Sequence, residues 1–144
     1  MKKTNNKGFS LVELIVVIAI MAVLVGVAAP TFTKYVEQSR RSTDIQNAEA
    51  IKTAMLAAMA DGEITADGTG ITVGKTSPAV CPTSLEEVPT IQGSIDKDDP
   101  FTMDYDAVAG TCKVYASGYE LTSATDAATY KTATAAKTAT PVTP

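Results

Sequence analysis

Histidine and tryptophan are both absent from the 144 residues of this chain. Without histidine, the sequence lacks the usual general base of enzymes and the most common metal ligand of proteins. Its two cysteines, Cys81 and Cys112, match no metal-binding spacing. No nucleophile–base pair and no metal site can be assembled from the remaining residue types, so we expect neither an enzyme nor a bound cofactor.

Basic residues are scarce beyond the start of the chain. The whole sequence has 12 basic and 16 acidic residues, and Lys2, Lys3 and Lys7 lie within the first eight positions. Without those eight positions, 9 basic residues remain against 16 acidic ones, a formal charge of −7. An acidic chain repels the phosphates of nucleic acids, so we expect no direct nucleic-acid site.

One segment is almost free of charge. From Phe9 to Ala29 there are 21 residues, and Glu13 is the only charged one. At about 1.5 Å per residue, a helix of this length spans roughly 30 Å, the thickness of the hydrocarbon core of a membrane. A carboxylate inside such a segment costs about 2.5–3.5 kcal/mol on insertion scales, so Glu13 needs an explanation.

Two common interpretations of this apolar segment are incomplete. A secretory signal peptide has a shorter apolar core, and the small residues at positions 27–29 are followed by Pro30, which is a poor position for cleavage. A plain transmembrane anchor would keep its basic start in the cytoplasm. That topology is sound, but it explains neither Glu13 nor the sequence KGF at residues 7–9.

A third interpretation explains both features. The sequence KGFSLVEL at residues 7–14 resembles the N-terminus of type IV pilins and pseudopilins, closely from Lys7 to about Pro30 and in outline beyond. The resemblance implies that prepilin peptidase cuts between Gly8 and Phe9. It also implies that the new amine of Phe9 is methylated, and that the apolar segment is retained after cleavage.

The resemblance gives Glu13 a partner. In this family, the glutamate at this position attracts the N-terminal amine of the neighbouring subunit during filament assembly. A buried charge that is paired costs much less than an unpaired one. Two local roles stay open: Ser10 and Glu13 have the spacing of a capping box at a helix start, and Glu13 can pair with the amine of its own chain.

Gly26 and Pro30 weaken the same helical turn, because proline cannot donate a hydrogen bond to the carbonyl of residue 26. We expect a kink here in the isolated subunit. The resemblance implies that the helix breaks locally in the filament. The alternative is a harmless kink, since membrane helices tolerate proline well.

Beyond Pro30 an amphipathic helix is expected to continue as far as Ala60 and to stop at Asp61-Gly62. Its apolar side chains fall within about 140° of arc. They are Ile45, Ala48, Ile51, Met55, Leu56 and Met59. A helix from Phe9 to Ala60 would measure roughly 78 Å, too long for a globular domain of this size. We therefore expect its first half in the membrane and later in the filament core.

Residues 61–122 are rich in turn signals and contain four short runs with strand propensity. These runs are Ile71–Val73, Met103–Val108, Thr111–Ala116 and Tyr119–Thr122. We expect three or four antiparallel strands laid across the helix, with a hairpin turn at Ala109-Gly110. This is the outline of the pilin fold, an α+β arrangement in which a long N-terminal helix packs on a small antiparallel sheet.

Cys81 and Cys112 belong to the part expected outside the cytoplasm, where disulfides persist. A bridge between them is expected; it would close a 32-residue loop and stabilise the head by roughly 3–4 kcal/mol in the chain-entropy model. Two free buried thiols are the alternative. Many pilins carry a disulfide near the C-terminus, and the early position of Cys81 departs from that pattern.

Two further segments have a biased composition. Five aspartates gather between Asp96 and Asp106; some pseudopilins bind calcium in the head, but no twelve-residue calcium loop is present here, so a solvated acidic loop is expected. Residues 123–144 contain 7 alanines and 7 threonines. This composition predicts a mobile tail, with at most a transient helix over Thr129–Ala139.

The chain is thus expected to have five parts: a leader at 1–8, an apolar helix at 9–30, an amphipathic helix at 31–60, a head at 61–122 and a tail at 123–144. The resemblance implies a structural subunit, a major pilin that polymerises through its N-terminal helix into an extracellular type IV pilus used for adhesion, motility or DNA uptake. The alternative is a pseudopilin of a type II secretion or competence machine.

The resemblance also implies partners and a location. The partners are other pilin subunits, the prepilin peptidase and methyltransferase, an inner-membrane assembly platform and, before assembly, membrane lipid. The subunit would cross the cytoplasmic membrane once and then move into a pilus on the cell surface.

Overall fold

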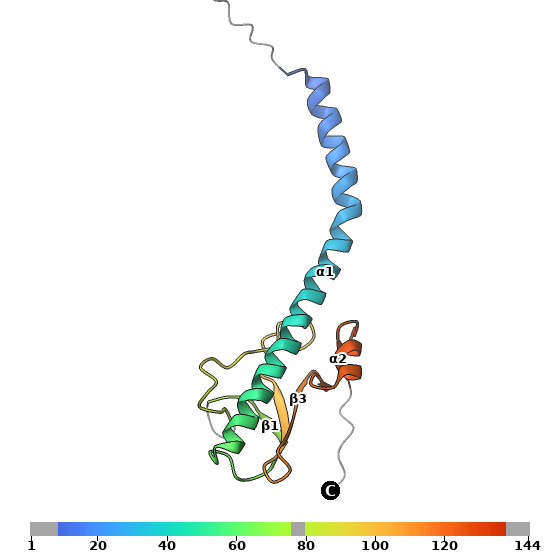
Figure 1. The fold of residues 1–144 in the computed structure, drawn as a ribbon. Coiled ribbons are helices and arrows are strands. Elements are labelled where there is room, and N and C mark those ends of the chain that lie inside the picture. The colour runs from blue at the N-terminus through green and yellow to red at the C-terminus, as the bar shows by residue number, and fades with distance from the viewer. Residues whose placement is uncertain (1–8, 76–79, 138–144) are drawn as a thin grey trace, which may run out of the picture. The chain divides into compact units, whose positions relative to one another are not determined.

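A computed structural model describes residues 9–75 and 80–137 of the chain. The chain forms two compact units, Met1–Val36 and Glu37–Pro144, and each is described by itself. The elements, labelled in Figure 1, are α1 (Leu11–Ala60), β1 (Gly68–Thr72), β2 (Thr102–Asp106), β3 (Thr111–Ala116), β4 (Tyr119–Glu120) and α2 (Ala124–Tyr130).

Pro30 lies inside α1 without ending it. The hydroxyl of Thr33 donates to the carbonyl of Pro30 at 3.0 Å, whereas the carbonyl that Pro30 leaves without a helical donor is that of Gly26. The break at Gly26 and Pro30 concerns the filament rather than the single subunit, so it stays a prediction.

Helix α1 ends at Ala60, as the sequence Asp61-Gly62 predicts. Gly62 has a φ of 74°, and its N–H donates to the carbonyl of Met59 at 3.2 Å. The N–H of Glu63 donates to the carbonyl of Ala58 at 2.9 Å. These two bonds form a Schellman motif, which satisfies carbonyls that the last helical turn leaves without a partner.

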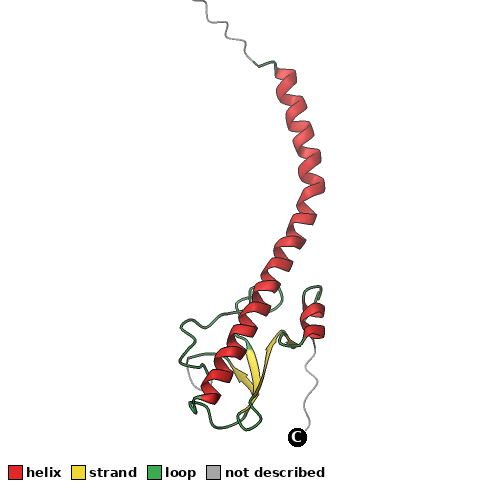
Figure 2. Cartoon of the chain, viewed as in Figure 1, coloured by secondary structure: helices red, strands yellow, loops and turns green. Residues whose placement is uncertain are grey.

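The four strands form one antiparallel sheet in the order β1-β2-β3-β4, drawn in yellow in Figure 2. The predicted α+β class and the antiparallel sheet are confirmed. β3 has the predicted bounds, whereas β2 ends at Asp106 rather than at Val108. The carboxylate of Asp106 accepts the N–H of Ala109 at 2.7 Å and so closes the turn before the strand can continue.

The core lies between the sheet and residues 37–60 of α1, which cross in front of it in Figure 1. Ala48, Ile51 and Met55 are fully buried there, against residues that include Met103 of β2 and Val114 of β3. Ile45, Leu56 and Met59 are partly buried at its margin. The predicted apolar stripe of the helix is therefore confirmed.

The prediction of a mobile tail is wrong for residues 124–130. They form α2, and Tyr130 is fully buried. The ring of Tyr130 lies 5.7 Å from that of Tyr119. One large aromatic side chain, in a segment otherwise made of alanine and threonine, anchors the segment to the core because it buries a large apolar area.

Candidate functional site

The first unit exposes a long apolar surface. Its large apolar side chains from Phe9 to Val27 range from 50% exposed at Val16 to 85% exposed at Phe9. By length and composition, this part of α1 is able to cross a membrane. An exposed apolar surface of this extent marks a region that lipid or another protein covers.

Glu13 lies at the start of this surface and takes part in the capping box that the sequence predicts. Its Oε2 accepts the N–H of Ser10 at 2.9 Å, and the hydroxyl of Ser10 accepts the N–H of Val12 at 3.4 Å. Two free donors of the first turn are satisfied in this way. This bond holds the carboxylate beside Ser10, the residue that follows Phe9. Gly8 lies outside the described residues.

Residues 3–29 match the family model of the prokaryotic N-terminal methylation motif. This match spans the lysines, the Gly8-Phe9 pair, Glu13 and most of the apolar segment. Residues 3–29 thus carry the N-terminal motif of type IV prepilins. Type IV pilins are structural subunits.

Known proteins resemble this chain over part of its length. A fimbrial protein of Moraxella nonliquefaciens is 38% identical over 91 residues, which cover 58% of this chain and 57% of the relative. The type IV major fimbrial protein FimA of Dichelobacter nodosus is 32% identical over 66 residues, with coverages of 46% and 41%. Prepilin peptidase-dependent protein A of Clostridium perfringens is 35% identical over 72 residues, with coverages of 50% and 51%.

The chain therefore spans about half the length of the curated relatives that it matches. No solved structure matches it.

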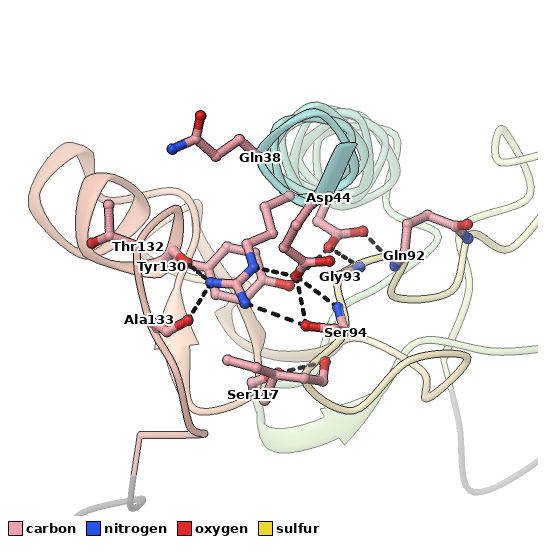
Figure 3. A network of polar contacts seen from close by, with 12 residues as sticks. Gln38, Asp44, Gln92, Gly93, Ser94, Ser117, Tyr130, Thr132 and Ala133 are labelled. Carbon is pink, nitrogen blue, oxygen red and sulfur yellow. Dashed lines mark hydrogen bonds and ion pairs between the residues drawn. The ribbon is translucent and has the colours of Figure 1, made fainter. Parts of the chain in front are cut away.

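The head of the chain contains a second polar site, which the sequence did not predict. We call it the polar clasp, and its members are Glu37, Arg41, Asp44, Ser94 and Tyr130. Figure 3 labels Asp44, Ser94 and Tyr130. Nη1 of Arg41 donates to the carbonyls of Tyr130, at 2.7 Å, and Ala133, at 2.6 Å. Its Nε donates to Glu37 at 2.6 Å. One arginine thereby joins α1 to the C-terminal part of the head.

Asp44 joins the same elements through its carboxylate. Its two oxygens accept the N–H groups of Gln92 and Gly93 at 2.7 and 2.9 Å, and Oδ2 also accepts the hydroxyl of Tyr130 at 2.8 Å. A Cβ on Gly93 would lie 2.8 Å from the Tyr130 hydroxyl oxygen and 3.1 Å from Oδ2 of Asp44. Only glycine allows this loop to approach the clasp so closely.

Glu37 completes the clasp on its solvent side. Burial tends to raise the pKa of Glu37, but the hydrogen bonds from Ser94 and Arg41 outweigh that effect and hold the pKa below its usual range. Burial also raises the pKa of Tyr130, and the hydrogen bond to Asp44 raises it further. Near neutral pH the clasp therefore has a charged Glu37 and a neutral Tyr130.

A signal for the clasp was present in the sequence. Arg41 and Asp44 precede Ala48, Ile51 and Met55 at the same alternating spacing of three and four, so they extend the buried stripe of α1 toward its N-terminus. Charged residues at positions of a buried stripe need partners. Those partners come from residues 92–94 and 130–133, and sequence reasoning does not bring these segments together.

The predicted disulfide is not formed in the structure, where Cys81 and Cys112 are both free thiols. Val80 pairs with Val73 on the side of β1 that faces away from β2, and Cys112 lies two strands further on, in β3. Three strand spacings of about 4.8 Å put roughly 14 Å between Val80 and β3, whereas a disulfide requires Cα atoms less than about 7 Å apart. The sheet topology keeps the cysteines apart.

Two of the five aspartates between Asp96 and Asp106 bind backbone N–H groups through their carboxylates. Asp104 accepts the N–H of Gly70 at 2.6 Å, and Asp106 accepts that of Ala109. Within residues 9–75 and 80–137, no group of three or more potential ligands is placed to hold a metal ion. The carboxylate of Asp106 closes the turn between β2 and β3, and that of Asp104 joins β2 to β1.

Proposed function

We propose that this chain is the major subunit of a type IV pilus and that it polymerises through its N-terminal helix. The apolar surface of residues 9–27 carries the proposal. It is exposed along its whole length and lies within the matched methylation motif. Its one carboxylate, that of Glu13, follows the proposed new N-terminus, Phe9, by four positions. Lipid covers such a surface before assembly, and the same surface of other subunits covers it in a filament.

The names of the relatives support a pilus subunit over a pseudopilin. Two of them are fimbrial proteins, and the FimA relative is a type IV major fimbrial protein. The Clostridium relative is named for its dependence on prepilin peptidase, which supports cleavage between Gly8 and Phe9. In this proposal the subunit enters the cytoplasmic membrane, loses residues 1–8, is methylated on Phe9 and is moved by the assembly platform into a surface pilus.

Glu13 has a defined role in this scheme. Its carboxylate accepts one N–H of its own chain, and a carboxylate has about four lone-pair sites. The capping box therefore leaves capacity for the α-amine of a neighbouring Phe9, which is charged at neutral pH. Capping holds the carboxylate in position, and its charge selects the register of the incoming subunit.

A pair of substitutions separates these two roles. Glu13→Gln removes the charge but keeps an amide oxygen able to accept the N–H of Ser10, since glutamine also serves in capping boxes. Ser10→Ala removes the cap on Val12 and keeps the charge. We expect Glu13→Gln subunits to be cleaved normally yet to form no surface filaments, and Ser10→Ala subunits to assemble at a cost of about 1 kcal/mol at the helix start.

The measurements are mass spectrometry of the mature chain and electron microscopy of material sheared from cells. Both variants should begin at methylated Phe9, which shows that any loss of filaments follows processing. Long filaments in the wild type favour a pilus, and short periplasmic ones favour a pseudopilin. Normal piliation by Glu13→Gln would rule out the charge-pairing role and leave capping as the function of Glu13.

A further inference from the structure

The C-terminal part of the head depends on contacts with other elements. We call residues 123–137 the strap. Its helix α2 has seven residues, the side chain of Ser123 makes no cap bond, and no basic residue lies in the last turn. A helix this short is marginal in water by itself. The strap therefore stays folded only while other elements hold it.

Two sets of polar contacts hold the strap. At its centre, Arg41 binds the carbonyls of Tyr130 and Ala133, and Asp44 binds the Tyr130 hydroxyl. At its end, the N–H of Lys137 donates to the carbonyl of Ser117 at 2.8 Å, and the hydroxyl of Tyr119 donates to the carbonyl of Ala135 at 3.2 Å. The ion pair between Lys137 and Asp126 lies within the strap and is partly exposed, so the central polar contacts and the buried ring of Tyr130 dominate.

The central contacts involve buried charge. Arg41 and Asp44 are 4% and 0% exposed, and they are the only buried charged side chains in the described part of the chain. In that same part, every buried side-chain nitrogen or oxygen has a hydrogen-bond partner. A buried charged network of this kind is costly to break, because removing one member leaves the others without partners in an apolar environment.

The sheet is held in a different way. Ile51 and Met55 of α1 pack against Met103 and Val114 with no polar contact required. We propose that the strap opens and closes as one unit, latched by the polar clasp, while the sheet remains folded on α1. Opening separates Tyr130 from Arg41 and Asp44 and uncovers the face of α1 that carries them. Local opening in cooperative units of this kind is common in proteins, and the weakest contacts set where it occurs.

Hydrogen exchange with peptide resolution tests the proposal on the full-length chain in detergent. The reporters in the strap are amides bonded within it, such as those of Ala127, Lys131 and Ala133, and the reporters in the sheet are those of β2 and β3. Arg41→Met keeps an unbranched apolar stem at this position but removes the guanidinium group and its donors. We expect exchange in the strap to accelerate tenfold or more, and exchange in β2 and β3 to change less than twofold.

Two further variants make the result decisive. Arg40→Met is the matched control, since Arg40 is the exposed neighbour of Arg41 and should leave both regions unchanged. Tyr130→Phe keeps the aromatic ring and deletes only the bond to Asp44, so it should show the same localised acceleration in milder form even if Arg41→Met fails to fold. Equal acceleration in strap and sheet, or no acceleration in either, would overturn the proposal.

Discussion

At the scale of single residues, the two cysteines show how the surroundings of identical thiol groups change their reactivity. Cys112 is 6% exposed, and burial raises the pKa of its thiol to about 11. Cys81 is half-buried in a loop, where its sulfur contacts the carbonyls of Pro82 and Leu85. Because the thiolate is the reactive form, a buried thiol with a raised pKa is inert.

This difference predicts the outcome of thiol labelling. At about pH 8, a maleimide should modify Cys81 in the native protein and leave Cys112 unmodified, since Cys112 is both covered and protonated. After denaturation without a reductant, both thiols should react. Mass spectrometry of the labelled chain counts the adducts, and Cys81→Ser is the control that should abolish native labelling. A denatured chain with no reactive thiol would show that a bridge forms after all.

At the scale of elements, α1 is one helix with two kinds of environment. Ile18 and Ile51 are both isoleucines of α1, but Ile18 is 61% exposed and Ile51 is fully buried. Apolar side chains stabilise a fold only where folding removes them from water. The stability of the head should therefore depend on the second half of α1.

Ile51→Ala should lower the free energy of unfolding of the head by about 2–5 kcal/mol, because it leaves a cavity between α1 and the sheet. Ile18→Ala deletes the same atoms from an exposed position and should leave the head unaffected. Urea unfolding in detergent, followed by the near-ultraviolet circular dichroism of the tyrosines, measures both. Equal losses in the two variants would contradict this division of α1.

At the scale of the whole molecule, the proposed function makes the fate of residues 1–8 decisive for whether the chain leaves the membrane. Residues 1–8 carry three lysines, and basic residues next to an apolar segment stay on the cytoplasmic side. In the proposed function, a subunit that kept these three lysines could not bury its N-terminus in the apolar core of a filament, because unpaired charges are costly to bury. Removal of the leader is thus a condition for assembly in the proposed function.

Gly8→Val should block cleavage and leave a precursor that inserts in the membrane but forms no filament. Mass spectrometry of the isolated protein checks whether residues 1–8 remain, and microscopy checks filaments. Gly26→Val is the control for processing, since nothing lies within 4 Å of a Cβ at Gly26 and the cleavage site is untouched. A mature wild-type chain beginning anywhere other than Phe9 would remove the basis of the proposed processing.

Features that depend on neighbours in the chain were predictable. The apolar segment, the Ser10–Glu13 capping box, the stop of α1 at Gly62 and the stripe of Ile51 and Met55 all follow from local spacing. Helical periodicity, capping and turn chemistry act within a few residues, so the sequence alone contains them.

Only the tertiary structure decided how distant segments meet. The strand order keeps Cys81 and Cys112 apart, and the burial of Tyr130 holds part of the predicted tail in the helix α2. The tertiary structure also paired Arg41 and Asp44 with segments about 50 to 90 positions away. In the sequence by itself these are two cysteines, an alanine- and threonine-rich end and two charges. Their roles depend on long-range packing rather than on local spacing, because packing determines which polar groups and which aromatic ring are buried together.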